Sequence, residues 1–427
     1  MYKNFKMNIL VIGGGGREHT LCWKLNQSKH CYKLYAAPGN AGTSECATNL
    51  PIGVSDFEKI KTAVLDNQIN LVVVGPEEPL VLGIHDFFLN DPALSHVSVL
   101  GPQKKAAKLE GSKAFAKSFM NRHNIPTAAY AEFTAETFSE GEDFLEKSNP
   151  PYVLKADGLA AGKGVLIIND LVQAKKELHQ MLLENKFGKA SNKVVIEEFL
   201  SGIELSCFVL TDGENYLTLP MAKDYKRIGE GDTGLNTGGM GAVSPVPFLD
   251  SSFEKKISAQ IIKPTIEGLK KDKTPYKGFL FIGLIKVGDE PKVIEYNVRL
   301  GDPETEVVIP RVKNDLVELF KSVQEGTLNG IRLDIESKAA ATVMAVSKGY
   351  PQDYEKGKTI KGLSKGKMIF HAGTKIINGE VQTSGGRVLA FTSLGKDHRT
   401  ALKNSYKTLS KVTFEGINYR TDIGFDL

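Results

Sequence analysis

The sequence of 427 residues predicts an α/β protein built from three parts. In the first part, short apolar runs end in Gly or Pro turns, as parallel strands do. In the middle part, a Gly-rich loop separates two short apolar runs, and the final part alternates short strands with turns before one helix. We place the parts at residues 1–108, 109–333 and 334–427, with a small mobile subdomain at about 124–192.

Composition limits the classes of partner. The net charge of +4 is small and the basic residues are scattered, so we expect no nucleic acid. No apolar run reaches the ~18 residues that a membrane helix needs. The four cysteines form no C-x-x-C pair, which argues against disulfides or zinc and favours a reducing cytoplasm. Met7 is an alternative start, and we expect neither a signal segment before it nor a fused second enzyme at the end.

The first strand predicted is residues 8–12, and Gly13 to Gly16 lead from it into a helix through Leu25. A dinucleotide fingerprint counted from Gly13 would need a third glycine at position 18, which is Glu18. The next strand, residues 33–36, is followed by no acid for a ribose, so NAD is disfavoured. Two interpretations stay open: a phosphate at this helix N-terminus beside Arg17, or a turn needed only for packing.

Two more strands in the first part end in loops. Residues 71–74 lead into Gly75-Pro76-Glu77, and residues 97–100 lead into Gly101-Pro102. Open parallel sheets bind ligands beyond the carboxyl ends of their strands. The loops together predict a ligand-lined edge, although each alone is ordinary turn chemistry.

The middle part begins with a phosphate-loop candidate. Residues 152–154 and 165–168 are expected strands, and the loop 155–164 between them carries Lys155 and Lys163. Its glycines would let backbone N–H groups face phosphates. A Walker loop is excluded because three residues, rather than four, separate Gly158 from Gly162 and no Ser or Thr follows Lys163. A Gly-rich hairpin without ligand is the alternative.

Two polar segments follow. After the strand 194–196, the connector 197–200 with Phe199 could hold an adenine edge and Glu204 a ribose, although an acidic solvated hairpin is the plainer interpretation. The long Gly-dense loop 224–241 is expected to be functional, since its composition is not low-complexity. Its Lys226 and Arg227 could meet anionic oxygens.

A strand over residues 292–299 carries the metal candidates. Glu295 and Asn297 are two residues apart, so their side chains leave the same face, and Arg299 is expected there too. One carboxylate and one amide oxygen suit Mg²⁺, which completes its shell with phosphates and water. Taken alone, a solvent-facing strand edge would explain them. Residues 301–305 then end the strand and start a helix.

In the last part, the expected strands are 342–346, 368–374 and 386–390, followed by a helix from about 397 to 412. We find no catalytic constellation there. A packing domain that closes one wall of a cleft is the interpretation.

With these residues taken together, the chain resembles the ATP-grasp enzymes and, among them, the glycinamide ribonucleotide synthetase family. The motifs run in order from Met7 to the end of the chain, which makes the resemblance specific. They are GGGGREH at 13–19, PGNAGT at 38–43, GPEEPL at 75–80, LEGSKAF at 109–115, KADGLAAGKGV at 155–165, VVIEEFLSG at 194–202, NTGGMGA at 236–242, VIEYNVRLGDPETE at 293–306, FHAGTK at 370–375 and GGRVL at 385–389.

The resemblance implies an ATP-grasp fold with a Rossmann-like N-terminal domain, a lid subdomain and a small α+β C-terminal domain. It implies a monomeric ligase of purine biosynthesis that joins glycine to 5-phosphoribosylamine with ATP and Mg²⁺ (or Mn²⁺), through a glycyl phosphate. The implied catalytic residues are Lys155, Asp224 and Arg299, and the implied metal ligands are Glu295 and Asn297. The implied nucleotide contacts are Lys113, Lys155, Gly158, Gly162, Lys163, Gly164, Glu197, Glu198, Phe199 and Glu204. The implied substrate contacts are Gly15, Gly16, Arg17, Glu18, Asn40, Glu77, Asp224, Asn236, Thr237, Gly238, Gly239, Arg299 and Asp302.

The sequence departs from the family pattern at some positions. Gly14 replaces a polar residue, Tyr225 stands where His is usual, and Leu235 stands where Pro is usual. The stretch 283–285 is apolar where many ATP-grasp enzymes carry a second metal-binding acid. The alternatives are another ATP-grasp carboxylate–amine ligase, a nucleotide-binding protein without turnover and, last, a Rossmann oxidoreductase.

Overall fold

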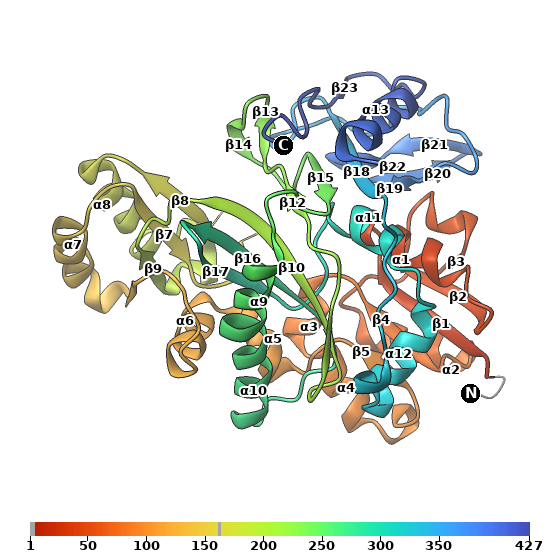
Figure 1. Ribbon diagram of the computed structural model, residues 1–427, viewed down its shortest axis with the longest axis horizontal. Coiled ribbons are helices and arrows are strands. Elements are labelled where there is room, and N and C mark those ends of the chain that lie inside the picture. Colours follow the sequence, from red (N-terminus) through yellow and green to blue (C-terminus); the bar gives the residue numbers. More distant parts are fainter. Residues whose placement is uncertain (1–4, 161–163) are drawn as a thin grey trace.

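The computed structural model describes residues 5–160 and 164–427. Its first part, red and orange in Figure 1, is a five-stranded parallel sheet. The strand order is β3 (Thr48–Asn49), β2 (Cys31–Pro38), β1 (Met7–Gly13), β4 (Leu71–Val74) and β5 (Ser98–Leu100). The helices are α1 (Gly16–Leu25), α2 (Phe57–Asp66), α3 (Glu77–Leu82), α4 (Ile84–Asn90) and α5 (Lys104–Gly111). The apolar strands are buried as predicted, and their carboxyl ends share one edge.

The second part is a subdomain that projects to the left in Figure 1. Its antiparallel sheet has the order β6 (Tyr130–Phe133), β9 (Val194–Glu197), β7 (Tyr152–Ala156) and β8 (Val165–Ile168). Helices α7 (Phe138–Lys147) and α8 (Leu171–Leu182) pack on it around a separate core that includes Leu145, Leu154 and Leu178. The sheet extends this unit beyond the predicted end at residue 192, because β9 lies between β6 and β7.

The central sheet is antiparallel, in the order β11 (Tyr216–Thr218), β10 (Ile203–Thr211), β16 (Gly278–Val287) and β17 (Glu290–Asn297). Helices α6 (Lys113–Arg122), α9 (Ser251–Ile257) and α10 (Lys263–Lys271) accompany it. The strand predicted over residues 292–299 was too long, since β17 ends at Asn297. The reason is that the N–H of Val298 donates to a Glu110 carboxylate oxygen at 2.7 Å instead of to a neighbouring strand.

The last sheet, which joins two green strands to blue ones in Figure 1, crosses the boundary predicted at residue 334. Its strands are β12 (Lys223–Asp224), β15 (Gly241–Ser244), β18 (Ala339–Ser347), β22 (Arg387–Gly395) and β19 (Ile369–His371), with β23 (Ile417–Asn418) beside β18. Thus two strands of the middle part pair with the C-terminal part. The helix predicted over 397–412 is α13 (His398–Leu409), and α11 (Thr305–Val308) and α12 (Leu316–Glu325) link the two parts.

Two expectations about loops need correction. The segment 224–241 is not an open loop, because β13 (Arg227–Gly229) and β14 (Thr233–Asn236) form a hairpin within it. The strand predicted over 368–374 ends at His371, and a second hairpin follows, made of β20 (Thr374–Ile377) and β21 (Glu380–Thr383).

Two negative expectations can be compared with the described residues. Cys22, Cys31, Cys46 and Cys207 are free thiols. None of the helices described in residues 5–160 and 164–427 combines the length and the apolarity needed to cross a bilayer.

Candidate active site

The phosphate-loop candidate joins β7 to β8 and rests against the start of α6. Ser112 caps α6 by accepting a hydrogen bond from the N–H of Phe115 at 3.1 Å. The Asp157 carboxylate accepts from the Ser112 hydroxyl at 2.9 Å and from the N–H of Ala114 at 2.8 Å. This places Lys113, the first residue of α6, beside the loop. Gly162 and Lys163 lie outside the described residues.

Lysines gather in front of this loop. Lys155 is buried, and its ammonium lies 2.9 Å from Glu197 Oε1. Burial lowers the pKa of Lys113, and the neighbouring Glu295 partly offsets that effect. Lys226 pairs with Glu204 at 2.6 Å and lies 4.0 Å from Asp224. Lysines and carboxylates thus alternate here, and Lys113 and Lys226 both lie close enough to Glu295 to interact with its charge.

The predicted adenosine contacts at the end of β9 and in the connector to β10 differ in burial. Glu198 and Phe199 are exposed, whereas the Glu197 carboxylate is buried between two lysines. Lys117, which the sequence reasoning missed, is the second of these, at 2.9 Å from Glu197 Oε2. The spacing was a usable signal, since Lys117 follows Lys113 by four residues on one helix face.

The predicted metal ligands and Arg299 lie together, as expected for one face. The Asn297 amide nitrogen is 3.4 Å from Glu295 Oε1, and the Arg299 guanidinium donates to Asn297 Oδ1 at 3.2 Å. Arg299 also donates to Glu110 at 2.9 Å and lies 3.3 Å from Glu77. Glu110 was missed by the sequence analysis, and burial raises its pKa to about 6 even beside Arg299.

Two more acids line this side of the site. Burial raises the pKa of Asp224, helped by Glu204 and opposed by Lys226. Burial, together with Asp224, also raises the pKa of Glu304 to about 7, and Glu304 accepts a hydrogen bond from the Ser206 hydroxyl at 3.1 Å. Glu304 thus offers a carboxyl group that can hold or release a proton near neutral pH, beside a second carboxyl group, that of Asp224, whose pKa is also raised.

The turn after β1 is closed by carboxylates of the chain itself. Glu18 accepts from the N–H of Gly15 at 2.6 Å, and Asp302 accepts from the N–H of Arg17 at 3.1 Å. The buried guanidinium of Arg17 donates hydrogen bonds to the Glu18 carboxylate and to the carbonyl of Leu300. Arg17 is therefore engaged within the protein, and its predicted contact with a phosphate stays a prediction.

Asn40, another predicted substrate contact, is also engaged at both ends of its amide. Its nitrogen donates to the carbonyls of Gly14 at 2.9 Å and His371 at 2.6 Å, and its oxygen accepts from the N–H of Gly42 at 2.8 Å. It ties the first part of the chain to the last. The N–H of His371 donates to His19 Nδ1 at 2.8 Å, and burial lowers the pKa of His19 to about 3.

The C-terminal part also reaches the Gly-dense segment that holds Asn236, Thr237, Gly238 and Gly239. Arg387 donates to the carbonyl of Gly238 at 2.5 Å and pairs with the Asp302 carboxylate at 3.2 Å. Beside them Glu306 is fully buried, and neither of its oxygens has a hydrogen-bond partner among the described residues. The sequence analysis interpreted this part as a packing domain that closes one wall of a cleft and did not single out Arg387, although Arg387 stands in the motif GGRVL.

Tyr225, a departure from the family pattern, fills the contact between the middle and C-terminal parts. Its ring is fully buried, and its hydroxyl donates to Asp426 at 2.8 Å. Lys223 and Arg420 lie over the ring, 4.4 Å and 5.5 Å from its centroid. Leu235, the other departure, is half exposed in β14.

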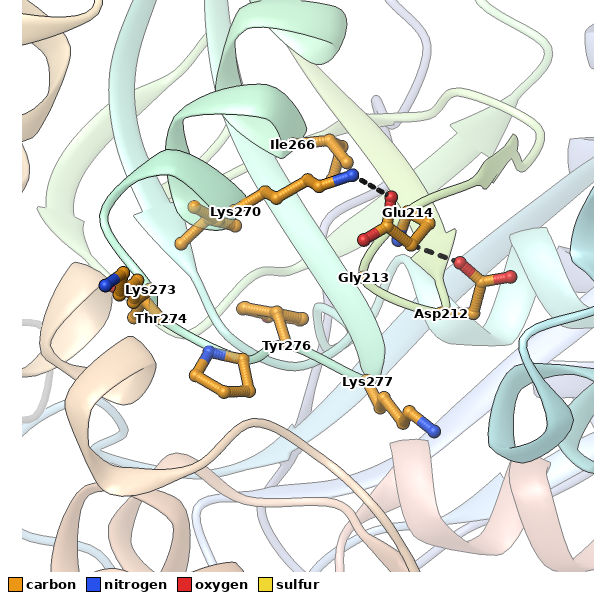
Figure 2. A pocket seen from close by; sticks show the side chains of 11 residues that line it. Asp212, Gly213, Glu214, Ile266, Lys270, Lys273, Thr274, Tyr276 and Lys277 are labelled. Atoms are coloured by element: carbon orange, nitrogen blue, oxygen red, sulfur yellow. Dashed lines mark hydrogen bonds and ion pairs between the residues drawn. The ribbon is translucent and has the colours of Figure 1, made fainter.

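A separate pocket of about 290 Å³ lies at the far end of the central sheet (Figure 2). It begins at Asp212, just after β10, and reaches Lys277, just before β16, whereas Glu204 lies at the other end of β10. Figure 2 shows Lys270 reaching across it to Glu214. No predicted site residue lines this pocket.

Comparisons with known proteins follow the same three parts. The chain matches the N domain of phosphoribosylglycinamide synthetase over residues 7–110, its ATP-grasp (A) domain over 111–305 and its C domain over 340–426. A phosphoribosylamine–glycine ligase of Caldanaerobacter subterraneus subsp. tengcongensis is 44% identical, over 98% of this chain and 99% of that protein.

Solved structures agree with these matches. A phosphoribosylamine–glycine ligase of Thermotoga maritima has 37% identity and a TM-score of 0.86, covering 97% of this chain and 99% of its own. A biotin carboxylase of Campylobacter jejuni, with 13% identity and a TM-score of 0.74, covers 99% of this chain and 97% of its own and shares the fold alone. The predicted ATP-grasp fold is confirmed, and the chain belongs to the phosphoribosylglycinamide synthetase family.

Proposed function

We propose that this protein is an ATP-dependent ligase that joins glycine to 5-phosphoribosylamine, giving glycinamide ribonucleotide, ADP and phosphate. The observation that carries the proposal is the convergence of three parts of the chain on one site. Lys113 lies close to both Glu295 and Lys155, Arg299 bridges Glu110 and Glu77, and Arg387 holds Asp302 beside the turn after β1. Family membership over the full length supports the same reaction.

The nucleotide side is formed by the subdomain and α6. Lys113 and Lys155 would neutralise the phosphates, and the backbone at Gly158 and Gly164 would cover them. The exposed Glu198 and Phe199 would border the adenosine. Glu204 would reach the ribose after exchanging its contact with Lys226.

A divalent cation fits the residues present. Glu295 and Asn297 offer one carboxylate and one amide oxygen on one strand face, and Lys113 close by could meet phosphate oxygens. This donor set suits Mg²⁺, and Mn²⁺ accepts the same ligands. When bound, the cation would supply charge neutralisation for the phosphoryl groups.

The chemistry divides into two displacements. A glycine carboxylate oxygen attacks the γ-phosphorus of ATP, the bond to the bridging oxygen breaks, and ADP leaves. The amine of phosphoribosylamine then attacks the carbonyl carbon of the glycyl phosphate, phosphate leaves with the electron pair, and the nitrogen loses a proton. Arg299 would hold the carboxylate, while Asp224 would hold the glycine ammonium, so that positioning and charge do most of the work.

We place this reaction in purine biosynthesis and the enzyme, as a monomer, in a reducing cytoplasm, where its free thiols would persist. Sedimentation at several concentrations tests the monomer. Concentration-dependent association would contradict it.

The first test is ADP release from Mg-ATP with glycine and freshly prepared phosphoribosylamine. Release should require both, and Glu295→Ala should abolish it while leaving the thermal unfolding midpoint within a few degrees of the unchanged protein. Tight ATP binding with no release under either condition would point instead to a different acceptor or to a nucleotide-binding protein without turnover.

A further inference from the structure

We propose that Lys117 is a positioning residue that holds Lys155 ready for the nucleotide phosphates through Glu197 and couples both to the hinge of the subdomain. The inference rests on the proposed function, because it assumes that the phosphates lie at Lys155. It assigns a role to a lysine that touches no substrate. Three sets of contacts support this role.

The first set concerns Lys117 itself, whose side chain is 2% exposed. Its ammonium lies 2.9 Å from Glu197 Oε2, donates to the Thr127 hydroxyl at 2.8 Å and reaches the carbonyl of Ala128 at 3.4 Å. An ammonium has three donors, so these contacts leave none for a ligand. The ring of Tyr130 covers it, with the centroid 5.6 Å away. Lys117 therefore acts through its neighbours.

The second set concerns Glu197, which lies between two cations. Its Oε1 is 2.9 Å from Lys155, yet that oxygen accepts no hydrogen bond from any residue in the described ranges 5–160 and 164–427. The attraction holds the Lys155 ammonium beside Glu197, and an ammonium with three donors keeps N–H groups for phosphate oxygens while it faces one carboxylate oxygen. Two lysines and one carboxylate also leave one net positive charge. Without Lys117, Glu197 would neutralise Lys155 one to one and draw it away from the phosphates.

The third set links this cluster to the hinge. The Thr127 hydroxyl accepts a hydrogen bond from the Lys117 ammonium and donates one to the carbonyl of Val293 at 2.7 Å. The N–H of Val293 donates to the carbonyl of Pro126 at 2.8 Å. Val293 is two residues before Glu295 in β17. Lys117 therefore lies where the entry to the subdomain, the phosphate lysine and the predicted metal strand meet.

The test compares Lys117→Met with Lys117→Arg. As a matched control we choose Lys193→Met, since Lys193 makes a 2.8 Å ion pair with Glu132 on the same sheet but is only partly buried. We expect Lys117→Met to weaken binding of a non-hydrolysable ATP analogue and to raise the KM for ATP at least tenfold, with a smaller change in kcat. Lys117→Arg should restore most of the affinity. The control should stay within twofold.

The pH profile separates positioning from plain packing. Burial lowers the pKa of Lys117 to about 8, against the opposing effect of Glu197. The charged groups that face it are Glu197, Lys155 and Glu198. Lys117 carries its charge below that pKa, so the affinity for the analogue should fall as the pH rises through about 8. Lys117→Arg should flatten this fall, because arginine keeps its charge.

The outcomes are distinct. A folded Lys117→Met protein that binds the analogue like the unchanged protein would overturn the inference. If Lys117→Met does not fold, Thr127→Val removes one contact of the ammonium and should raise the KM for ATP severalfold; no change would have the same meaning. Because analogue binding needs no turnover, it decides the inference even if glycine and phosphoribosylamine fail as substrates.

Discussion

The buried carboxyl groups around the three arginines of the site divide into two sets. Burial raises the pKa of Asp302, but Arg387 and Arg17 outweigh it, so the pKa ends below its usual value. Around Glu304 and Glu306 burial and neighbouring carboxylates outweigh the nearby cations, so the pKa of each is raised. Side chains of one chemical type thus hold different protonation states within one site, as groups that divide acid and base roles do.

Glu304 allows a pH prediction. Its pKa in the folded protein, about 7, is raised from the ordinary 4.5, so protonation stabilises the fold below pH 4.5 and that contribution is lost as the pH rises toward 7. Glu304→Gln, which cannot ionise, should make the decline of the unfolding free energy between pH 4.5 and 7 shallower by on the order of 1–3 kcal/mol. Urea unfolding at several pH values measures it.

The control for this change is Glu267→Gln, because Glu267 is exposed on α10. It should leave the pH profile unaltered. Identical profiles for Glu304→Gln and the unchanged protein would show that Glu304 is already ionised at neutral pH.

At the scale of an element, the start of α6 aligns a functional lysine by ordinary helix capping. Ser112 caps the helix, and Asp157 from the phosphate-loop candidate grips both the Ser112 hydroxyl and the N–H of Ala114. A cap of this kind stabilises a helix by about 1 kcal/mol. The same contacts fix the backbone position of Lys113, the first residue of α6.

We therefore predict that Ser112→Ala lowers the unfolding free energy by about 1 kcal/mol and also raises the KM for ATP severalfold. The matched variant is Asp170→Ala, which removes the cap of α8 on the outer side of the subdomain. Both should lose similar stability, and only Ser112→Ala should change the KM. Equal KM values for ATP in the two variants would show that the cap of α6 does not affect nucleotide binding. Chemical denaturation and ADP-release kinetics supply the two readouts.

Elements also mark how far sequence reasoning reached. The strands β1, β4, β7 and β8 were predictable because each is a short apolar run bounded by turn residues. Glu110 and Arg387 were not, because their roles come from contacts made across elements far apart in the chain. The hairpin inside 224–241 was missed for a different reason, since β14 is exposed and lacks the apolar pattern by which strands are predicted.

At the scale of the whole molecule, the last part of the chain completes the site that the first two parts begin. Arg387 crosses to Gly238 and Asp302, and Tyr350 accepts a hydrogen bond from the N–H of Gly238 at 3.0 Å. Asp302 in turn holds the N–H of Arg17. One arginine therefore connects the turn after β1, the Gly-dense segment and the C-terminal sheet.

We predict that Arg387→Met raises the KM for phosphoribosylamine or glycine at least tenfold and changes the KM for ATP less than twofold. Complete loss of the partner of a buried charge typically costs about 3–5 kcal/mol. Arg17 remains beside Asp302, so the cost here should be smaller, but it should still lower the unfolding midpoint. Steady-state kinetics with each substrate varied in turn, alongside thermal unfolding, test this. A rise confined to the KM for ATP would contradict it.

The last prediction concerns motion of the subdomain around β6–β9. It has its own hydrophobic core, and its entry strand meets the rest of the chain through the pairing of Thr127 with Val293. A unit with a separate core can rotate as a rigid body about such a connection. Binding of a Mg²⁺-loaded, non-hydrolysable ATP analogue should therefore lower the radius of gyration in X-ray scattering and slow amide exchange in β7. Glycine alone should do neither, and bound analogue with unchanged scattering and exchange would mean that the subdomain is already closed.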